Sequence, residues 1–167
     1  MQKITPWLWF DDEAEDAATH YVSIFSNRPR AQAGDSEITQ ISRYGDAGPR
    51  EAGLVMTVAY RLAGQDFVAL NGGPEGFTFD ESVSFMVSCK DQEEVDYFWN
   101  AFLDGGGKES VCGWLKDRFG LSWQIIPEAL ERLMGDPDAE KARRVTESML
   151  KMVKIDVAEL QRAHDAA

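Results

Sequence analysis

The first part of the chain carries one helical stripe between short apolar segments. Apolar residues recur at helical spacing from Ala14 to Phe25, after Asp12 and Glu15, a pair typical of a helix start. Four further segments are rich in aromatic, aliphatic and β-branched residues and predict strands: 4–10, 37–44, 54–62 and 66–71. Residues 1–75 are therefore predicted to form a strand, a helix and three more strands.

A second stretch, residues 82–127, repeats this order. Asp91 and Glu94 mark another helix start, and apolar residues at helical spacing follow from Val95 to Leu103. The predicted strands of this stretch are 82–89, 109–112, 113–116 and 121–127. The repeat is one of organisation, not of sequence identity, and chance similarity of two such patterns is the alternative.

The remaining residues, 128–167, predict a helical extension. Asp136-Pro137 places an N-cap before a proline at the first helical position, and Asp156 with Glu159 marks a further helix start. We expect these helices to lie outside the repeats and the whole chain, 1–167, to form a single domain.

Composition and charge narrow the function classes. The 167 residues are 44% hydrophobic, enough for a core without disulfides, and the net charge of −12 disfavours nucleic acid and anionic membrane surfaces as partners. No apolar run approaches the ~20 residues of a membrane helix, and the N-terminus lacks a secretory pattern. Because Cys89 and Cys112 alone make no disulfide framework, we expect a cytoplasmic protein.

Three segments resemble a known family. Leu-Asn-Gly-Gly-Pro at 70–74, and Cys-Gly-Trp at 112–114 leading into Phe-Gly-Leu-Ser-Trp-Gln-Ile-Ile-Pro at 119–127, are similar to the PhnB-like branch of the glyoxalase/bleomycin-resistance/dioxygenase (vicinal oxygen chelate) superfamily. Asp136-Pro137 and the run 149–152 also resemble this branch, which often carries the label 3-demethylubiquinone-9 3-methyltransferase. The resemblance implies an α+β fold of two βαβββ modules, which form a curved mixed or antiparallel sheet around a cavity and are followed by added C-terminal helices. It also implies a homodimer.

Strand alternation predicts which side chains line that cavity. In the first strand, Trp7 and Trp9 share the face opposite Leu8 and Phe10, and in the fourth strand we expect Phe67, Ala69 and Asn71 to point inward. The ligand-cavity candidates are Thr5, Trp7, Trp9, Phe67, Asn71, Ser84, Met86, Cys112, Trp114, Ser122 and Gln124. The three tryptophans would stack a flat ligand or pack in the core, and both interpretations stay open. The polar candidates Asn71, Ser84 and Gln124 would contact a ligand or one another. Cys112 has no evident activating partner, which favours a structural cysteine.

The metal site of the family's enzymes looks substituted. The resemblance places its four ligands at Thr5, at Ala69 or Asn71, at Ser84 and at Gln124, and none of these is a histidine or a carboxylate. Transition metals and zinc need imidazole, thiolate or carboxylate ligands. We therefore expect no tightly bound metal and no other cofactor, with a divalent metal as the alternative. The two histidines lie on predicted helices away from the cavity wall.

The leading hypothesis is a dimeric binding protein for a small, partly aromatic or apolar molecule. The alternative is a metal-dependent or metal-free lyase, isomerase or dioxygenase of the same superfamily, in which Glu75, Glu81 or Glu109 reach the cavity mouth from loops. A third possibility is an interaction domain that uses the C-terminal helices. Methyl transfer is disfavoured because no strand is followed by a glycine-rich turn that opens a helix. The sequence leaves open whether the chain is an enzyme.

Overall fold

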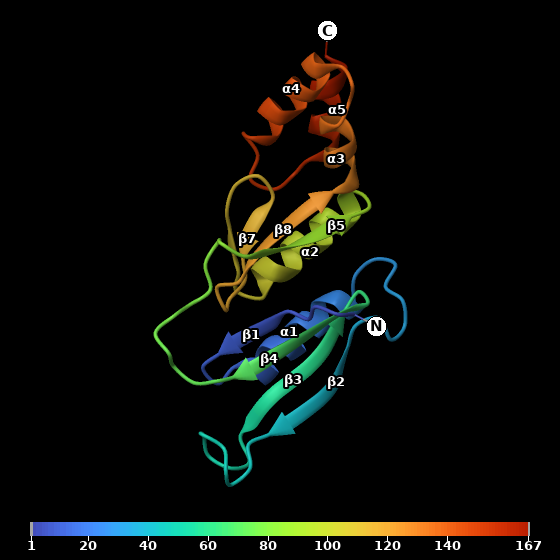
Figure 1. The fold of residues 1–167 in the computed structure, drawn as a ribbon. Helices are drawn as coiled ribbons and strands as arrows, with labels where there is room; N and C mark the ends of the chain where they lie inside the picture. The colour runs from blue at the N-terminus through green and yellow to red at the C-terminus, as the bar shows by residue number, and fades with distance from the viewer. Residues whose placement is uncertain (1, 167) are drawn as a thin grey trace. The chain divides into compact units, whose positions relative to one another are not determined.

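The fold is known from a computed structural model that describes residues 2–166, and the chain divides into two compact units at Phe77 and Thr78. Each unit contains one helix and one four-stranded sheet, and the second unit adds three C-terminal helices (Figure 1). The predicted α+β fold, with the order strand, helix, strand, strand, strand occurring twice, is confirmed. Between residues 2 and 166, no helix has the length and apolar character needed to cross a membrane.

The first unit is a mixed sheet with helix α1 (Ala14–Ser26) on one face. Its strands lie in the order β1 (Trp7–Phe10), β4 (Gln65–Asn71), β3 (Val55–Leu62) and β2 (Glu37–Arg43). β1 runs parallel to β4, and the other neighbours are antiparallel. Ala63 and Gly64 both have positive φ, at 48° and 85°, which is the backbone of the two-residue turn that joins twisted hairpin strands.

Aromatic rings form the core between α1 and this sheet. Tyr60 of β3 stacks on Phe67 of β4 with ring centroids 5.6 Å apart, and Tyr21 of α1 lies 6.2 Å from Tyr60. Small residues of α1 let the helix approach these rings closely, since Ala14, Ala17 and Ala18 are all fully buried. The first unit thus has its own core.

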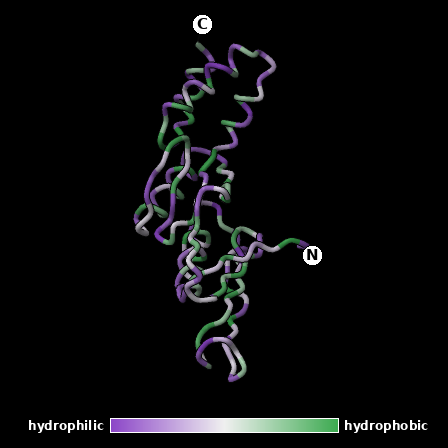
Figure 2. Tube along the Cα trace, turned by 60° about the vertical axis from the view of Figure 1, so that its left-hand side comes forward, coloured by the Kyte–Doolittle hydropathy of each residue, from purple (hydrophilic) through white to green (hydrophobic). Residues whose placement is uncertain are grey.

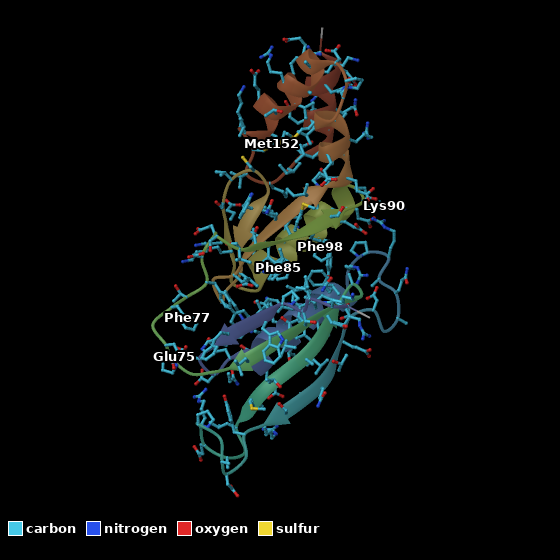
Figure 3. The ribbon with its side chains drawn as sticks, viewed as in Figure 1. Glu75, Phe77, Phe85, Lys90, Phe98 and Met152 are labelled. Carbon is cyan, nitrogen blue, oxygen red and sulfur yellow. The ribbon has the colours of Figure 1, made fainter. Side chains whose placement is uncertain are left out.

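The second unit repeats the topology. Its strands lie in the order β5 (Ser84–Cys89), β8 (Ser122–Pro127), β7 (Trp114–Lys116) and β6 (Lys108–Glu109), with β5 parallel to β8. Helix α2 (Gln92–Asp104) covers one face, where Phe102 meets Trp123 at a centroid distance of 4.8 Å. Figure 3 labels Phe85 of β5 and Phe98 of α2, and Phe85 also packs on Trp123, at 5.7 Å.

A buried carboxylate shapes the turn between β7 and β8. Asp117 accepts hydrogen bonds from the backbone N–H groups of Phe119 (2.8 Å) and Leu121 (3.0 Å) and from the indole Nε1 of Trp123 (2.9 Å). Charge-assisted hydrogen bonds of this kind are about twice as strong as neutral ones. They fix the turn and the Trp123 ring together.

The C-terminal helices pack on the end of β8. They are α3 (Glu128–Met134), α4 (Ala139–Met149) and α5 (Val157–Asp165). Their shared core consists of Ile126, Leu130, Leu133, Val145, Ile155 and Leu160. Figure 2 shows hydrophobic and hydrophilic residues alternating along these helices, as expected for helices buried on one face. The predicted helical extension is therefore confirmed.

Candidate functional site

Each sheet has a face that its own helix does not cover, here called the open face. In the first unit the register places Trp7 beside Val68 and Trp9 beside Leu70, whereas Leu8 and Phe10 are buried toward α1. The predicted faces of the first strand are therefore the observed ones. Thr5 lies two residues before β1 and outside any strand.

Two exposed indoles form an aromatic platform on this open face. Trp7 is 61% exposed, and Trp9 donates its Nε1–H to the carbonyl of Gly73 at 2.9 Å. Phe77, labelled in Figure 3, lies on the loop after β4. Its ring meets the Trp9 ring edge-on, with centroids 5.5 Å apart. A Cβ at Gly72 would lie 2.0 Å from the Trp9 ring. The two glycines of the segment 70–74 therefore position Trp9, one by its small size and one by its carbonyl.

Asn71 lies on the helix face, so the prediction that it points inward to the cavity is wrong. Its Oδ1 accepts the backbone N–H of Ala14 at 2.8 Å, and its Nδ2 donates to the carbonyl of Val55 at 3.1 Å. The N-cap residue of α1, Glu13, makes no capping bond with its side chain. Asn71 therefore caps α1 from across the sheet, a structural role.

Phe67 is the second correction. It shares the helix face with Ala69 and Asn71, because the register pairs Leu8 with Ala69 and Tyr60 with Phe67. The open face of β4 instead carries Asp66, Val68 and Leu70. Both alternating sets of β4 contain apolar residues, so polarity alone does not distinguish the two faces of this strand.

The open face of the second unit carries the side chains predicted there. Register pairs Ser84 with Ser122, Met86 with Gln124 and Gln124 with Trp114, opposite the face on which Trp123 contacts α2. Gln124 donates from Nε2 to the Ser84 hydroxyl at 2.8 Å. These two polar residues therefore bond to each other, and a ligand contact stays a prediction.

A pocket of about 220 Å³ opens beside this face. Its lining residues are Glu81, Lys108, Glu109, Ser110, Trp114, Leu115, Lys116 and Ser122. Lys116 Nζ binds Glu81 Oε1 at 2.6 Å, and this bond holds the pKa of the Glu81 carboxyl below its ordinary value. Within residues 2–166, the Ser122 hydroxyl is buried without any hydrogen-bond partner. Sequence reasoning missed Lys108 and Lys116, whose strands are too short to show alternation.

The surroundings of both cysteines indicate a role in the fold. Cys112 has a positive φ of 57°, and its N–H bonds to the carbonyl of Met152 at 2.8 Å, which ties the loop before β7 to the segment after α4 (Figure 3). The next residue strengthens this connection, because the Gly113 N–H donates to the carbonyl of Val153 at 2.7 Å. Cys89 is buried, and burial, followed by Glu94 and Asp91, raises the pKa of its thiol to about 12. Both thiols are unpaired.

The donor groups at the family's metal positions do not fit a transition metal or zinc. Ala69 and Asn71 lie on the helix face, and Ser84 and Gln124 offer a neutral hydroxyl and amide that bond to each other. The carboxylate on the open face of β4, Asp66, is bound by Arg61 Nε at 2.9 Å. Across residues 2–166, no three His, Cys, Asp or Glu side chains converge as metal ligands.

Comparisons with known proteins identify the family of the chain. The sequence model of the family described as 3-demethylubiquinone-9 3-methyltransferase matches residues 2–126, ending before α3. The PhnB protein from Bacillus cereus is 33% identical with a TM-score of 0.64, over 75% of this chain and 99% of that one.

Two more distant structures share the fold. Protein PA1353 from Pseudomonas aeruginosa is 18% identical with a TM-score of 0.59, over 77% of this chain and 98% of that one. The fosfomycin resistance protein FosX from Listeria monocytogenes is 12% identical with a TM-score of 0.50, over 78% and 96%. Among curated proteins, none matches. The chain belongs to the PhnB-like family described as 3-demethylubiquinone-9 3-methyltransferase.

Proposed function

We propose that this protein binds a small, partly aromatic or apolar molecule in the pocket on the open face of its second sheet. The observation that carries the proposal is Ser122, a residue that lines the pocket with Trp114 and is 99% buried, and whose hydroxyl has no partner among the described residues. A buried polar group without a partner costs about 1–3 kcal/mol. A ligand oxygen or nitrogen at this position would recover that cost.

The pocket dimensions favour a single-ring molecule. Its volume of about 220 Å³ is smaller than the roughly 300–1,000 Å³ of pockets for drug-sized ligands. Trp114 supplies an aromatic surface at one side, and ring contacts of this kind contribute about 0.5–1.5 kcal/mol beyond the area that they bury. In the first unit, the exposed Trp7 and Trp9 offer a second surface of the same chemistry.

Binding in this proposal needs no metal, because the hydroxyl and the indole are sufficient contacts.

Methyl transfer is disfavoured, since each sheet has a single parallel strand pair and neither resembles the parallel sheet of a Rossmann-type donor site. We also propose a homodimer, which the family resemblance implies, and a location in the cytoplasm. Native mass spectrometry of protein purified without chelator reports the dimer mass, any metal and any retained ligand together.

Acid–base chemistry without a metal is the second candidate. It is favoured by Glu81, an acidic residue that lines the pocket. The bond to Lys116 keeps the pKa of Glu81 low, so this side chain is ionised at neutral pH and would act as a base only after Lys116 moves away.

The test is a screen of single-ring aromatic molecules by ligand-observed NMR against the wild-type chain, Trp114→Ala and Ser122→Ala. Leu150→Ala is the control, since Leu150 is exposed at the end of α4. We expect both pocket variants to weaken the same hits, with Ser122→Ala more stable than wild type by about 1 kcal/mol because it loses an unsatisfied hydroxyl. Hits that survive both substitutions unchanged would contradict the proposal.

A further inference from the structure

We propose that the ligand carries an anionic group, a carboxylate or another oxyanion, that binds between the ammonium of Lys108 and the hydroxyl of Ser122. The inference rests on the proposed function and names the chemical class of its ligand. In this arrangement Trp114 contacts the apolar body of the molecule.

The first argument is the order of side chains across the open face. Register pairs Lys108 with Lys116, and Lys116 with Ser122, so these three residues form one row across β6, β7 and β8. The neighbouring row, two residues along the strands, consists of Trp114, Gln124 and Met86. A row of cationic and hydroxyl groups thus lies about 7 Å from a row in which Trp114 and Met86 flank the Gln124 amide. This spacing suits a small molecule with one charged end.

The second argument is the charge balance within the row of Lys108, Lys116 and Ser122. Like charges directly opposite each other on neighbouring strands are destabilising. Lys116 is neutralised by Glu81 at 2.6 Å, whereas no acidic side chain among the described residues pairs with Lys108. The row therefore holds one uncompensated cation, on a chain whose net charge is −12.

The other acidic residue of the pocket does not neutralise Lys108. Glu109 pairs in register with Leu115, whose side chain is buried on the face that α2 covers. Strand alternation directs Glu109 to that face and Lys108 to the open one. An anionic ligand group is the missing counter-charge, and Ser122, the third member of the row, is a hydroxyl donor without a partner in the part of the chain described.

The experiment compares benzoate with benzamide, its neutral counterpart of similar shape, by NMR titration of the full chain. We expect benzoate to bind about tenfold or more tightly than benzamide, because hydrogen bonds to charged groups are the stronger class. Lys108→Gln should remove most of this preference. Lys90→Gln is the matched control, since Lys90 is an exposed lysine of the same unit at the end of β5 (Figure 3). The preference should also shrink at high salt, which screens exposed charges.

The outcomes separate the two proposals. Equal binding of both probes, or a benzoate preference that Lys108→Gln leaves intact, would overturn the anion subsite while the binding function stands. Benzoate binding lost in Lys108→Gln and kept in Lys90→Gln would support it. Failure of both probes to bind in the millimolar range would overturn the subsite and count against the proposed function.

Discussion

The two units share a topology, yet their open faces carry opposite charge patterns. In the first unit, the row across β2, β3 and β4 is Glu37, Arg61 and Asp66, and Arg61 contacts both acids, at 3.3 Å and 2.9 Å. In the second unit, the row across the matching strands begins with Lys108 and Lys116. In the first row both acids contact one guanidinium, whereas in the second row Lys108 pairs with no acid among the described residues.

Under the proposed function, this difference would place ligand binding in the second unit. Topology determines which residues become neighbours, but the side chains in each row decide whether the row is self-contained or available to a ligand. The first unit instead offers apolar surface, with Trp7 and Trp9 on the same face.

The largest expected effect concerns the helix starts. Asn71→Ala leaves the Ala14 N–H and the Val55 carbonyl without their side-chain partner, so we expect the free energy of unfolding to fall by about 2–4 kcal/mol. Asp91→Ala is its counterpart in the second unit. Asp91 caps α2 locally by accepting from the Glu94 N–H, and its loss should cost only about 1 kcal/mol. Urea denaturation measures both. Equal losses would mean that the two helices are anchored in the same way.

The second effect concerns the aromatic platform. Gly72→Ala places a Cβ 2.0 Å from the Trp9 ring, so Trp9 must rotate and lose its bond to Gly73. We expect a loss of about 1–3 kcal/mol, as for other overpacked sites, together with a change in tryptophan fluorescence. Gly45→Ala is the control, because a Cβ there meets nothing within 4 Å. If Gly72→Ala matched the control in stability and fluorescence, the Trp9 ring would not be in close contact with residue 72.

Sequence patterns predicted the elements well, except that the strand expected at 109–112 is Lys108–Glu109, and they predicted the faces in part. Clean alternation assigned Trp7, Met86 and Gln124 to the open faces, because the intervening residues of those strands are consistently apolar. It failed at Phe67 and Asn71, since an amide that caps a helix across a sheet is indistinguishable in sequence from one that faces a cavity.

The charged row escaped prediction for a different reason. Lys108 and Lys116 belong to strands of two and three residues, which are too short to show an alternation of apolar and polar residues. Their pairing with each other and with Ser122 is a property of register, and register follows from the turns and the packing of the whole sheet.

The smallest expected effect lies in the C-terminal helices, which only the second unit has. His164 bonds to Asp165 at 2.8 Å and to Asp136 at 2.9 Å, and these bonds, Asp165 first, raise the pKa of the imidazole. A raised pKa means that the stabilisation is complete below the ordinary value of 6.5 and is lost as pH rises through the folded-state value. We therefore expect amide hydrogen exchange in α5, corrected for its intrinsic pH dependence, to show weaker protection at about pH 8.5 than at about pH 5.5. In His164→Gln this difference should disappear, while amides of β3, in the other unit, serve as the internal reference. A pH response of equal size in α5 and β3, or one that persists in the variant, would place its origin elsewhere than at this histidine.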